Sequence, residues 1–192
     1  MSEETKQDDH NRPDPITNLL LESRQVIICE GIDQKMAKRV TAQLLALAGD
    51  SDKPITMFIN SQGGHVEAGD TIHDIIQFIK PTVRMVGTGW VASAGTHIFL
   101  AAKKENRFCL PNTRFLIHQP SGGVGGTASD IEIQAEQIEQ MRERLAKIIS
   151  ATTGTDIEQV RKDIERDKWM NTDEAIKYGI LSKVITSAAE LD

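Results

Sequence analysis

A serine and a histidine lie in settings that suit nucleophilic catalysis. Ser93 stands in the small-residue segment VASAG, and His118 follows it by 25 residues at the end of the apolar run RFLIH. A serine hydroxyl is a weak nucleophile unless a base takes its proton, a third group orients that base and N–H donors stabilise the oxyanion. Each residue alone is more typical of structure, the serine of a helix N-cap and the histidine of a hydrogen-bonded strand end. Together they predict a hydrolase.

Two neighbouring glycines form a second candidate feature. Gly63 and Gly64 lie in INSQGGHVEAG, after an apolar run and before a helical pattern. Glycine there lets the backbone turn sharply and brings an N–H group close to a ligand. The segment lacks the lysine and spacing of a phosphate loop and the G-x-G-x-x-G of a dinucleotide site, so phosphate binding is the less favoured interpretation.

The orienting acid cannot be chosen from spacing and periodicity. The candidates that remain open are Asp130, Asp156, Asp163, Asp167 and Asp173. Val91 also stands where a nucleophile elbow G-x-S-x-G has its first glycine, and α/β-hydrolases place the acid before the histidine in chain order. If Ser93 and His118 are partners, the fold is that of some other serine hydrolase.

Alternating strands and helices must position these residues. Apolar runs of strand length at 25–29, 55–59, 83–87 and 114–118 alternate with helical patterns at about 33–48, 66–79 and 93–102. This α/β order predicts a largely parallel sheet with right-handed crossover helices. Two short helices, at about 156–165 and 172–178, and a final strand SKVIT complete the predicted elements.

A longer helical pattern runs from Thr127 to about Thr153. Its apolar positions recur at steps of three and four, at Ile131, Ala135, Ile138, Met141, Leu145 and Ile148. A helix of roughly 40 Å follows, longer than a small domain needs to cover its own sheet. Two interpretations stay open: a helix that extends beyond the body and packs against another subunit, or one long core helix.

The composition limits the class of protein. The 192 residues fit a single domain at 16–192 after a polar tail at 1–15, which we expect to be disordered. A formal charge of -6 argues against nucleic-acid binding, and without a membrane span or signal peptide we expect the cytoplasm. Cys29 and Cys109 both lie in apolar runs, which predicts two buried thiols and neither a disulfide nor a zinc site.

At these residues the chain resembles the proteolytic subunit of the Clp protease, the ClpP family of self-compartmentalising serine peptidases. The similarity extends from about Leu19 to Ile185 and is densest in INSQGG, VASAGT, RFCLPNTRFLIHQPSGG and IERDKWMNTDEAIKYGI. It implies a ClpP/crotonase-like ββα superhelix. The long helix at about 127–153 would be a handle between two stacked seven-membered rings, a tetradecamer that encloses the active sites.

The resemblance also assigns roles to residues. It implies Ser93 as nucleophile, His118 as base and Asp167 as acid. The implied oxyanion donors are the N–H groups of Gly64 and Ala94. A peptide substrate would bind as an added strand along His65, Val66, Glu67 and Ser121, Gly122, Gly123. An AAA+ unfoldase would dock in a groove formed by Phe58, Phe78, Phe108 and Ile185. Arg166 would make an inter-ring contact. No metal or cofactor is expected in this chain, because ATP would be used by the unfoldase.

The chain departs from the family pattern at several positions. Gln62 replaces a usual proline, Ala94 a usual methionine, His97 a bulky apolar residue and Thr56 an aromatic one. The N-terminal segment also lacks the family's axial-loop pattern, which favours a divergent paralogue. Our first hypothesis is a cytoplasmic, ATP-dependent serine endopeptidase that degrades unfolded proteins in protein quality control. The alternatives are a weakly active or regulatory subunit of a mixed ring with a ClpP paralogue, and a crotonase-type acyl-CoA enzyme.

Overall fold

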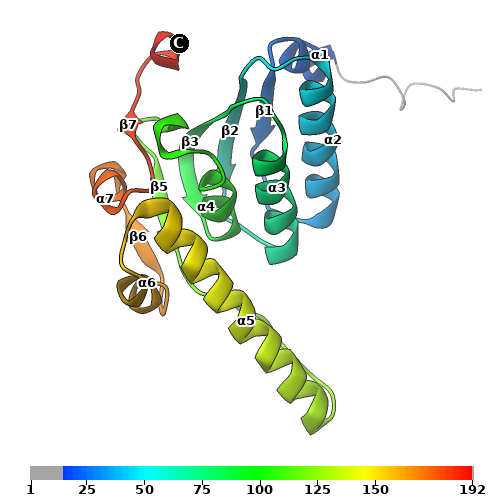
Figure 1. The fold of residues 1–192 in the computed structure, drawn as a ribbon, viewed down its shortest axis with the longest axis vertical. Coiled ribbons are helices and arrows are strands. Elements are labelled where there is room, and N and C mark those ends of the chain that lie inside the picture. The colour runs from blue at the N-terminus through cyan, green and yellow to red at the C-terminus, as the bar shows by residue number, and fades with distance from the viewer. Residues whose placement is uncertain (1–14, 192) are drawn as a thin grey trace, which may run out of the picture.

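A seven-stranded sheet forms the centre of the computed structural model, which describes residues 15–191 (Figure 1). The strands are β1 (Gln25–Ile28), β2 (Ile55–Ser61), β3 (Val83–Ala92), β4 (Arg107–Cys109), β5 (Arg114–Ile117), β6 (Lys168–Met170) and β7 (Lys183–Val184). The helices are α1 (Pro15–Glu22), α2 (Gln34–Asp50), α3 (Val66–Phe78), α4 (Ala94–Phe99), α5 (Ala128–Thr153), α6 (Ile157–Asp163) and α7 (Thr172–Tyr178), with 3-10 turns η1 (Lys104–Asn106) and η2 (Ala188–Leu191). The predicted tail, 1–15, lies outside the described residues except for Pro15, which begins α1.

The sheet forks at β3. Its order is β1-β2-β3-β4-β7 with every pair parallel, and the far half of β3 also pairs in parallel with β5. β6 then adds to β5 in the antiparallel direction. The sequence predicted the parallel character but not β4, β6 or α1. Strands of three residues are too short for a period of two to register, so β4 and β6 leave no clear pattern.

The core lies between the sheet and the helices α2 and α3, which pack side by side on it (Figure 1). Along β2 the inward side chains Ile55, Met57 and Ile59 are fully buried and alternate with half-buried ones, as expected for period-two patterning. Val40 and Leu44 of α2 are likewise fully buried. Burying a large aliphatic side chain stabilises a fold by roughly 1.5–3 kcal/mol, so this layer supplies much of the stability of the body.

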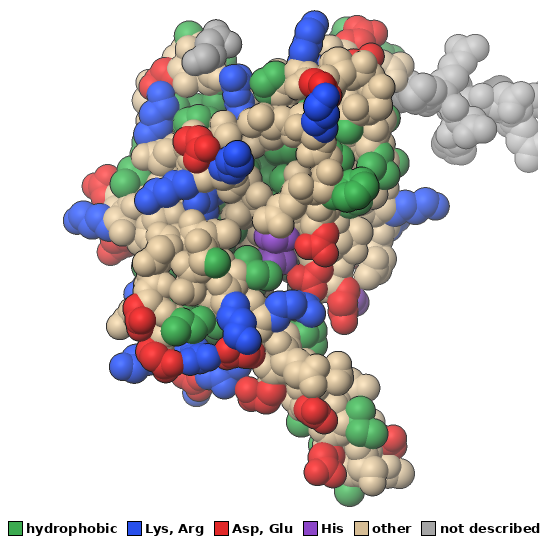
Figure 2. Space-filling model, viewed as in Figure 1, with side chains coloured by type: hydrophobic (Ala, Val, Ile, Leu, Met, Phe, Trp, Pro, Cys, Tyr) green, Lys and Arg blue, Asp and Glu red, His purple; other side chains and the backbone are tan. Residues whose placement is uncertain are grey.

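Helix α5 leaves the body along most of its length (Figure 1). Its buried residues are only Ala146 and Ile149, both near its C-terminal end. On the projecting end Ile131 and Ile133 are exposed among acidic side chains, and Figure 2 shows red and green but no blue there. The interpretation as one long core helix is therefore wrong. No helix within residues 15–191 is long and apolar enough to cross a membrane.

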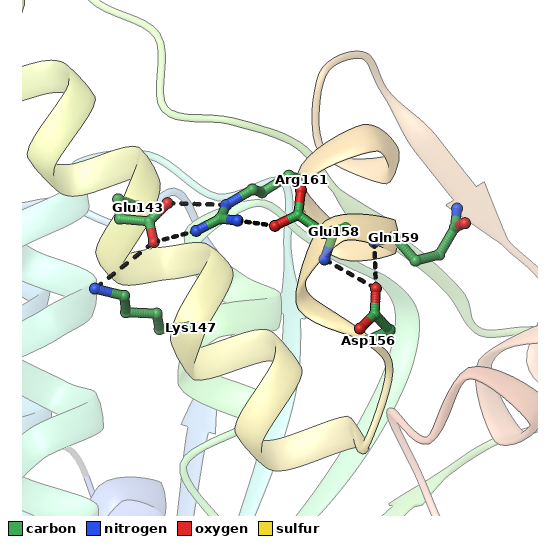
Figure 3. A network of polar contacts seen from close by, with 6 residues as sticks. All are labelled: Glu143, Lys147, Asp156, Glu158, Gln159 and Arg161. Carbon is green, nitrogen blue, oxygen red and sulfur yellow. Dashed lines mark hydrogen bonds and ion pairs between the residues drawn. The ribbon is translucent and has the colours of Figure 1, made fainter.

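An ion-pair network fastens α6 to the base of α5 (Figure 3). Arg161 donates from Nε and Nη2 to the two carboxylate oxygens of Glu143, at 3.1 and 2.6 Å. Asp156 caps α6 by accepting from the backbone N–H groups of Glu158 and Gln159, at 3.1 and 3.2 Å. Bidentate arginine–carboxylate contacts are the more directional kind, so α6 is held in one orientation against α5.

The two cysteines lie in different environments. Cys109, in β4, is fully buried, and burial raises the pKa of its thiol to about 11. Cys29 is exposed, so the prediction of two buried thiols is wrong for this residue. The reason is that β1 pairs only with β2 and buries Val26 and Ile28, which turns the alternate positions Ile27 and Cys29 toward solvent.

This difference predicts selective thiol chemistry. We expect a maleimide at neutral pH to add once per folded chain, at Cys29, because alkylation needs an accessible thiolate and Cys109 offers neither access nor ionisation. Intact mass and peptide mapping measure the adduct, with Cys29→Ser as the control. Rapid addition at Cys109 without denaturant would contradict the arrangement.

Candidate active site

Ser93 stands at the sharp turn from β3 into α4. Its backbone has φ 57° and ψ −123°, and Arg24 is the only other non-glycine with positive φ among residues 15–191. This conformation is unfavourable for a residue with a Cβ and persists only where neighbours enforce it. Here Ser93 N–H donates to the Leu116 carbonyl at 3.0 Å, and the Ser93 carbonyl accepts from His97 N–H at 3.1 Å. The turn therefore projects a half-buried hydroxyl at the N-terminus of a helix.

The glycine pair lies directly against this turn. Gly63 and Gly64 have φ of 95° and 152°. A Cβ on Gly63 would come within 2.5 Å of the Ser93 Cβ and 3.1 Å of the Ala94 nitrogen, and one on Gly64 within 2.2 Å of the Ile32 carbonyl oxygen. Only glycine permits both the φ values and these distances. The pair thus brings backbone of the 63–64 turn beside the first N–H groups of α4, which have no intrahelical acceptor.

Strand pairing brings the histidine and one aspartate together. In the antiparallel register of β5 and β6, Ile117 pairs with Lys168, so the next residues outward, His118 and Asp167, face each other. His118 Nδ1 lies 2.9 Å from Asp167 Oδ1, and His118 Nε2 lies 2.8 Å from Ser93 Oγ. One imidazole therefore bridges the hydroxyl and the carboxylate, the arrangement a serine hydrolase needs.

The residues around His118 hold this geometry. Gln119 donates from its backbone N–H to the Ile164 carbonyl at 2.7 Å and from Nε2 to the Glu165 carbonyl at 3.0 Å. These bonds attach the strand end after His118 to the turn that carries Asp167. The Asp167 side chain nevertheless remains 62% exposed, against 27% for His118. Water competes for an exposed carboxylate, so the contact between Asp167 and His118 is weaker than the contact between His118 and Ser93.

A small pocket opens beside Ser93. Its lining comes from α3, α4, α5 and the segment after β5, and consists of Val66, Asp70, Ser93, Ala94, His97, His118, Pro120, Met141, Arg144, Leu145 and Ile148. Sequence reasoning named His97 among the departures from the family but missed Asp70 and Arg144. A signal existed for Asp70, because it lies one helical turn after Val66, as His97 lies one turn after Ser93.

The predicted peptide-binding segments differ in local structure. His65 is extended, whereas Val66 and Glu67 form the first turn of α3. N–H groups in the first turn of a helix have no intrahelical acceptor, so a peptide strand along His65–Glu67 stays a prediction. Ser121, Gly122 and Gly123 lie in an exposed segment without regular structure, and so remain available to an extended peptide.

The residues assigned to unfoldase docking are only partly together. Phe58, Phe108 and Ile185 belong to one apolar cluster with Val86 and Leu191, in which Phe108 and Ile185 are buried. Phe78, at the end of α3, is 79% exposed and lies outside this cluster. Arg166 is exposed, and among the described residues it makes no hydrogen bond or ion pair. Within residues 15–191 no group of three or more His, Cys, Asp or Glu side chains is arranged to hold a metal ion.

Comparisons with known proteins agree on one family. A family model described as "Clp protease" matches residues 7–188. The "ATP-dependent Clp protease proteolytic subunit" of Paracoccus denitrificans is 60% identical over 167 residues, which cover 87% of this chain and 84% of the relative. "ATP-dependent Clp protease proteolytic subunit 2" of Pseudomonas aeruginosa is 54% identical over 171 residues, covering 89% and 85%.

The fold agrees with solved structures as well. "ClpP1 from Listeria monocytogenes" superposes with a TM-score of 0.84 at 53% identity, covering 92% of this chain and 99% of that one. A point mutant of the same Listeria protein gives a TM-score of 0.86 at 54% identity with the same coverage.

The close approach of Gly63 to Ser93 yields a prediction. We expect Gly63→Ala to slow phosphonylation of Ser93 by a fluorophosphonate about 100-fold, the scale of loss when reacting groups are misplaced by about an ångström. The control is Gly49→Ala, because a methyl group there meets nothing within 4 Å and its φ is negative. Equal rates in the two variants would show that the 63–64 turn tolerates a side chain.

Proposed function

The chain belongs to the Clp protease family, and from this premise we propose that it hydrolyses peptide bonds of unfolded polypeptides as a subunit of an ATP-dependent Clp protease. It is a Clp-type proteolytic subunit and a serine-type endopeptidase. The observation that carries the proposal is the continuous hydrogen-bonded chain from Ser93 through His118 to Asp167. ATP would be consumed by a partner unfoldase, and this chain needs no cofactor of its own.

The three side chains divide the chemistry between them. His118 Nε2 removes the proton from Ser93 Oγ as that oxygen attacks the carbonyl carbon of the scissile bond. The same imidazole then gives the proton to the leaving amine, and an acyl-serine remains. Asp167 accepts from Nδ1, which keeps the neutral ring in the tautomer whose Nε2 is a base and stabilises the imidazolium that forms. Water, activated in turn by His118, hydrolyses the acyl-enzyme.

Backbone N–H groups of Gly64 and Ala94 would stabilise the oxyanion. Ala94 is the first residue of α4, so its N–H is free of intrahelical bonds and lies at the positive end of the helix. The approach of the 63–64 turn to this point supports the second donor. Fixed donors at a developing negative charge are typically the largest single contribution to such catalysis, and losing one costs about 100- to 1,000-fold in rate.

The peptide would lie against the exposed segment Ser121–Gly123 on one side of Ser93 and against extended His65 on the other. Val66 also contributes its side chain to the pocket. The unpaired N–H and C=O groups of an extended segment give sequence-independent affinity, as in other peptide-binding proteins that add a strand. This suits a protease that acts on many unfolded chains.

The protein would act within an oligomeric chamber. The projecting end of α5 exposes Ile131 and Ile133 to solvent. Contact with a second subunit would bury these apolar side chains, which supports the handle assignment. We propose two stacked seven-membered rings, with Arg166 reaching across them. An AAA+ unfoldase would dock on the cluster of Phe58, Phe108 and Ile185 and on the separate, exposed Phe78. A cytoplasmic location stays a prediction.

One observation favours a second candidate function. The Asp167 carboxylate is largely exposed, and Gln62 stands in the turn before the glycine pair, so an isolated subunit can hold a formed triad with a weakly secured acid. A subunit that gains activity only in a mixed ring with a ClpP paralogue fits this description. Assignment of the chain as a crotonase-type acyl-CoA enzyme would leave the hydrogen-bonded series of Ser93, His118 and Asp167 without a role.

Reaction of the purified chain with a fluorophosphonate tests the catalytic assignment. We expect one adduct per chain at Ser93, as Oγ displaces fluoride from phosphorus, and none in Ser93→Ala. That variant should keep its fold and native mass, because one half-buried hydroxyl contributes little to stability. An unlabelled wild-type chain within an intact ring would favour the regulatory subunit, and labelling that survives in Ser93→Ala would refute the assigned nucleophile.

Removal of Arg166 tests the link between assembly and the site. We expect Arg166→Ala to shift the native mass from double to single rings and to lower peptidase activity about tenfold, because an inter-ring contact beside Asp167 would help to hold that acid. Arg39→Ala is the control, since it removes another exposed arginine, on α2 and outside the β5–β6 ladder. Unchanged mass and activity in Arg166→Ala would exclude the assigned contact.

A further inference from the structure

The pocket beside Ser93, called the slot below, has a polar pair, Asp70 and His97, in its lining. Ser93 and His97 lie one turn apart at the start of α4, and Val66 and Asp70 lie one turn apart at the start of α3. Along both helices the polar pair therefore lies one turn, about 5.4 Å, from the residues beside the hydroxyl.

The walls of the slot are apolar. Its hydrophobic lining consists of Val66, Ala94, Pro120, Met141, Leu145 and Ile148. A methylene stem that enters the slot is removed from water against such walls, which is favourable for each CH₂ group. The entrance therefore favours an unbranched aliphatic stem over a short polar one.

The far end of the slot is polar. Asp70 Oδ1 lies 2.9 Å from His97 Nε2, and Asp70 Oδ2 accepts from Arg144 Nη2, which comes from α5. Burial alone would raise the pKa of Asp70, but the contacts with His97 and the charge of Arg144 lower it overall, so the carboxylate is ionised at neutral pH. The end of the slot thus combines an anion and a cation at contact distance.

Part of this polar end has no partner. His97 is buried, and its Nδ1 makes no hydrogen bond within the described part of the chain. The ring cannot turn freely, because it stacks on His73 with centroids 4.3 Å apart and planes 4° from parallel. Arg144 binds through Nη2 alone, which leaves its other N–H groups available. The remaining guanidinium N–H groups of Arg144 are therefore the donors that a ligand in the slot can use.

The charges of the pair select against charged ligands. A lysine end would bring a second cation to Arg144, and a glutamate end a second anion to Asp70, so either meets repulsion from one member of the pair. A leucine or phenylalanine end would cover the ion pair without offering it a hydrogen bond. A carboxamide both donates and accepts, so it matches Asp70 and Arg144 together.

We propose that the P1 residue of the substrate, the one that supplies the scissile carbonyl, is preferentially glutamine, and that Asp70 and Arg144 are the residues that determine this specificity. Methionine ranks second, because it has the same unbranched length and a weakly accepting sulfur. The inference rests on the proposed function, since it takes Ser93 as the nucleophile beside the slot.

The test compares acetyl-tripeptide coumarylamides that differ only in P1: Gln, Met, Leu, Phe, Glu and Lys. For the wild-type assembly we expect kcat/KM to be highest for Gln and at least about tenfold lower for Glu and Lys, a typical penalty for unpaired charge or lost hydrogen bonds in a specificity pocket. A wild-type preference for Leu or Phe over Gln would overturn the proposal.

Two variants with matched controls assign the preference to the ion pair. Asp70→Asn leaves Arg144 without its anion, so kcat/KM for Glu relative to Gln should rise about tenfold. Arg144→Gln leaves Asp70 without its cation, so the Lys to Gln ratio should rise by a similar factor. The controls remove the same charges one turn or less away, outside the pocket: Asp74→Asn on α3 and Lys147→Gln on α5, both highly exposed.

Fluorophosphonate labelling of Ser93 in every sample distinguishes a failure of the proposed function from a failure of the P1 assignment. An unlabelled wild-type protein would overturn the proposed function and this inference with it. Full labelling with the same P1 order in wild type and both pocket variants would overturn the pocket assignment alone. If Asp70→Asn fails to fold, the Lys to Gln ratio of Arg144→Gln decides, because Arg144 is half-exposed and lies on a helix anchored elsewhere.

Discussion

The position of β5 between β3 and β6 is the constraint on which the active site depends. Its parallel register with β3 pairs Leu116 with Ala92 and lets the Leu116 carbonyl accept from Ser93 N–H. Its antiparallel register with β6 sets His118 opposite Asp167. His118 must reach the Ser93 hydroxyl on one side and the Asp167 carboxylate on the other. It can do so because it follows β5, which pairs with both β3 and β6. Backbone pairing, which is insensitive to side-chain identity, does the positioning.

Small residues make the remaining approach possible. The strained backbone of Ser93 costs about 1–3 kcal/mol, and the surrounding contacts must offset this cost. Gly63 lies against the Ser93 Cβ, and a Cβ at Gly69 would lie 3.2 Å from the Ala94 Cβ, so α3 and the 63–64 turn close tightly on the start of α4. The same closeness defines the slot beside the nucleophile, because it brings Asp70 of α3 next to His97 of α4. The strained backbone of Ser93, the oxyanion donors and the pocket beside the nucleophile therefore depend on the same close contacts between α3, the 63–64 turn and α4.

The sequence predicted the parts of the site that leave a local pattern. Ser93 stands among small residues, His118 ends an apolar run and the glycine pair follows one, so each could be found without its partners. The acid could not, because Asp167 precedes a strand of three residues, KWM, in which alternate exposure is invisible without the pairing to β5. Cys29 was misjudged for a related reason: whether a strand lies at the edge of a sheet depends on its tertiary neighbours. The resemblance to the Clp protease family supplied Asp167 where periodicity left five aspartates open.

The short β5–β6 ladder has a consequence for how the site can be turned off. It consists of three residue pairs, and Asp167 is flanked on both sides by cationic residues, Arg166 and Lys168. Because side chains alternate between faces of a strand, sliding β6 by one residue would replace the carboxylate opposite His118 with a positive charge. Such a neighbour opposes imidazolium formation instead of assisting it. The observed register of this short ladder is therefore a condition for having a carboxylate at His118 Nδ1.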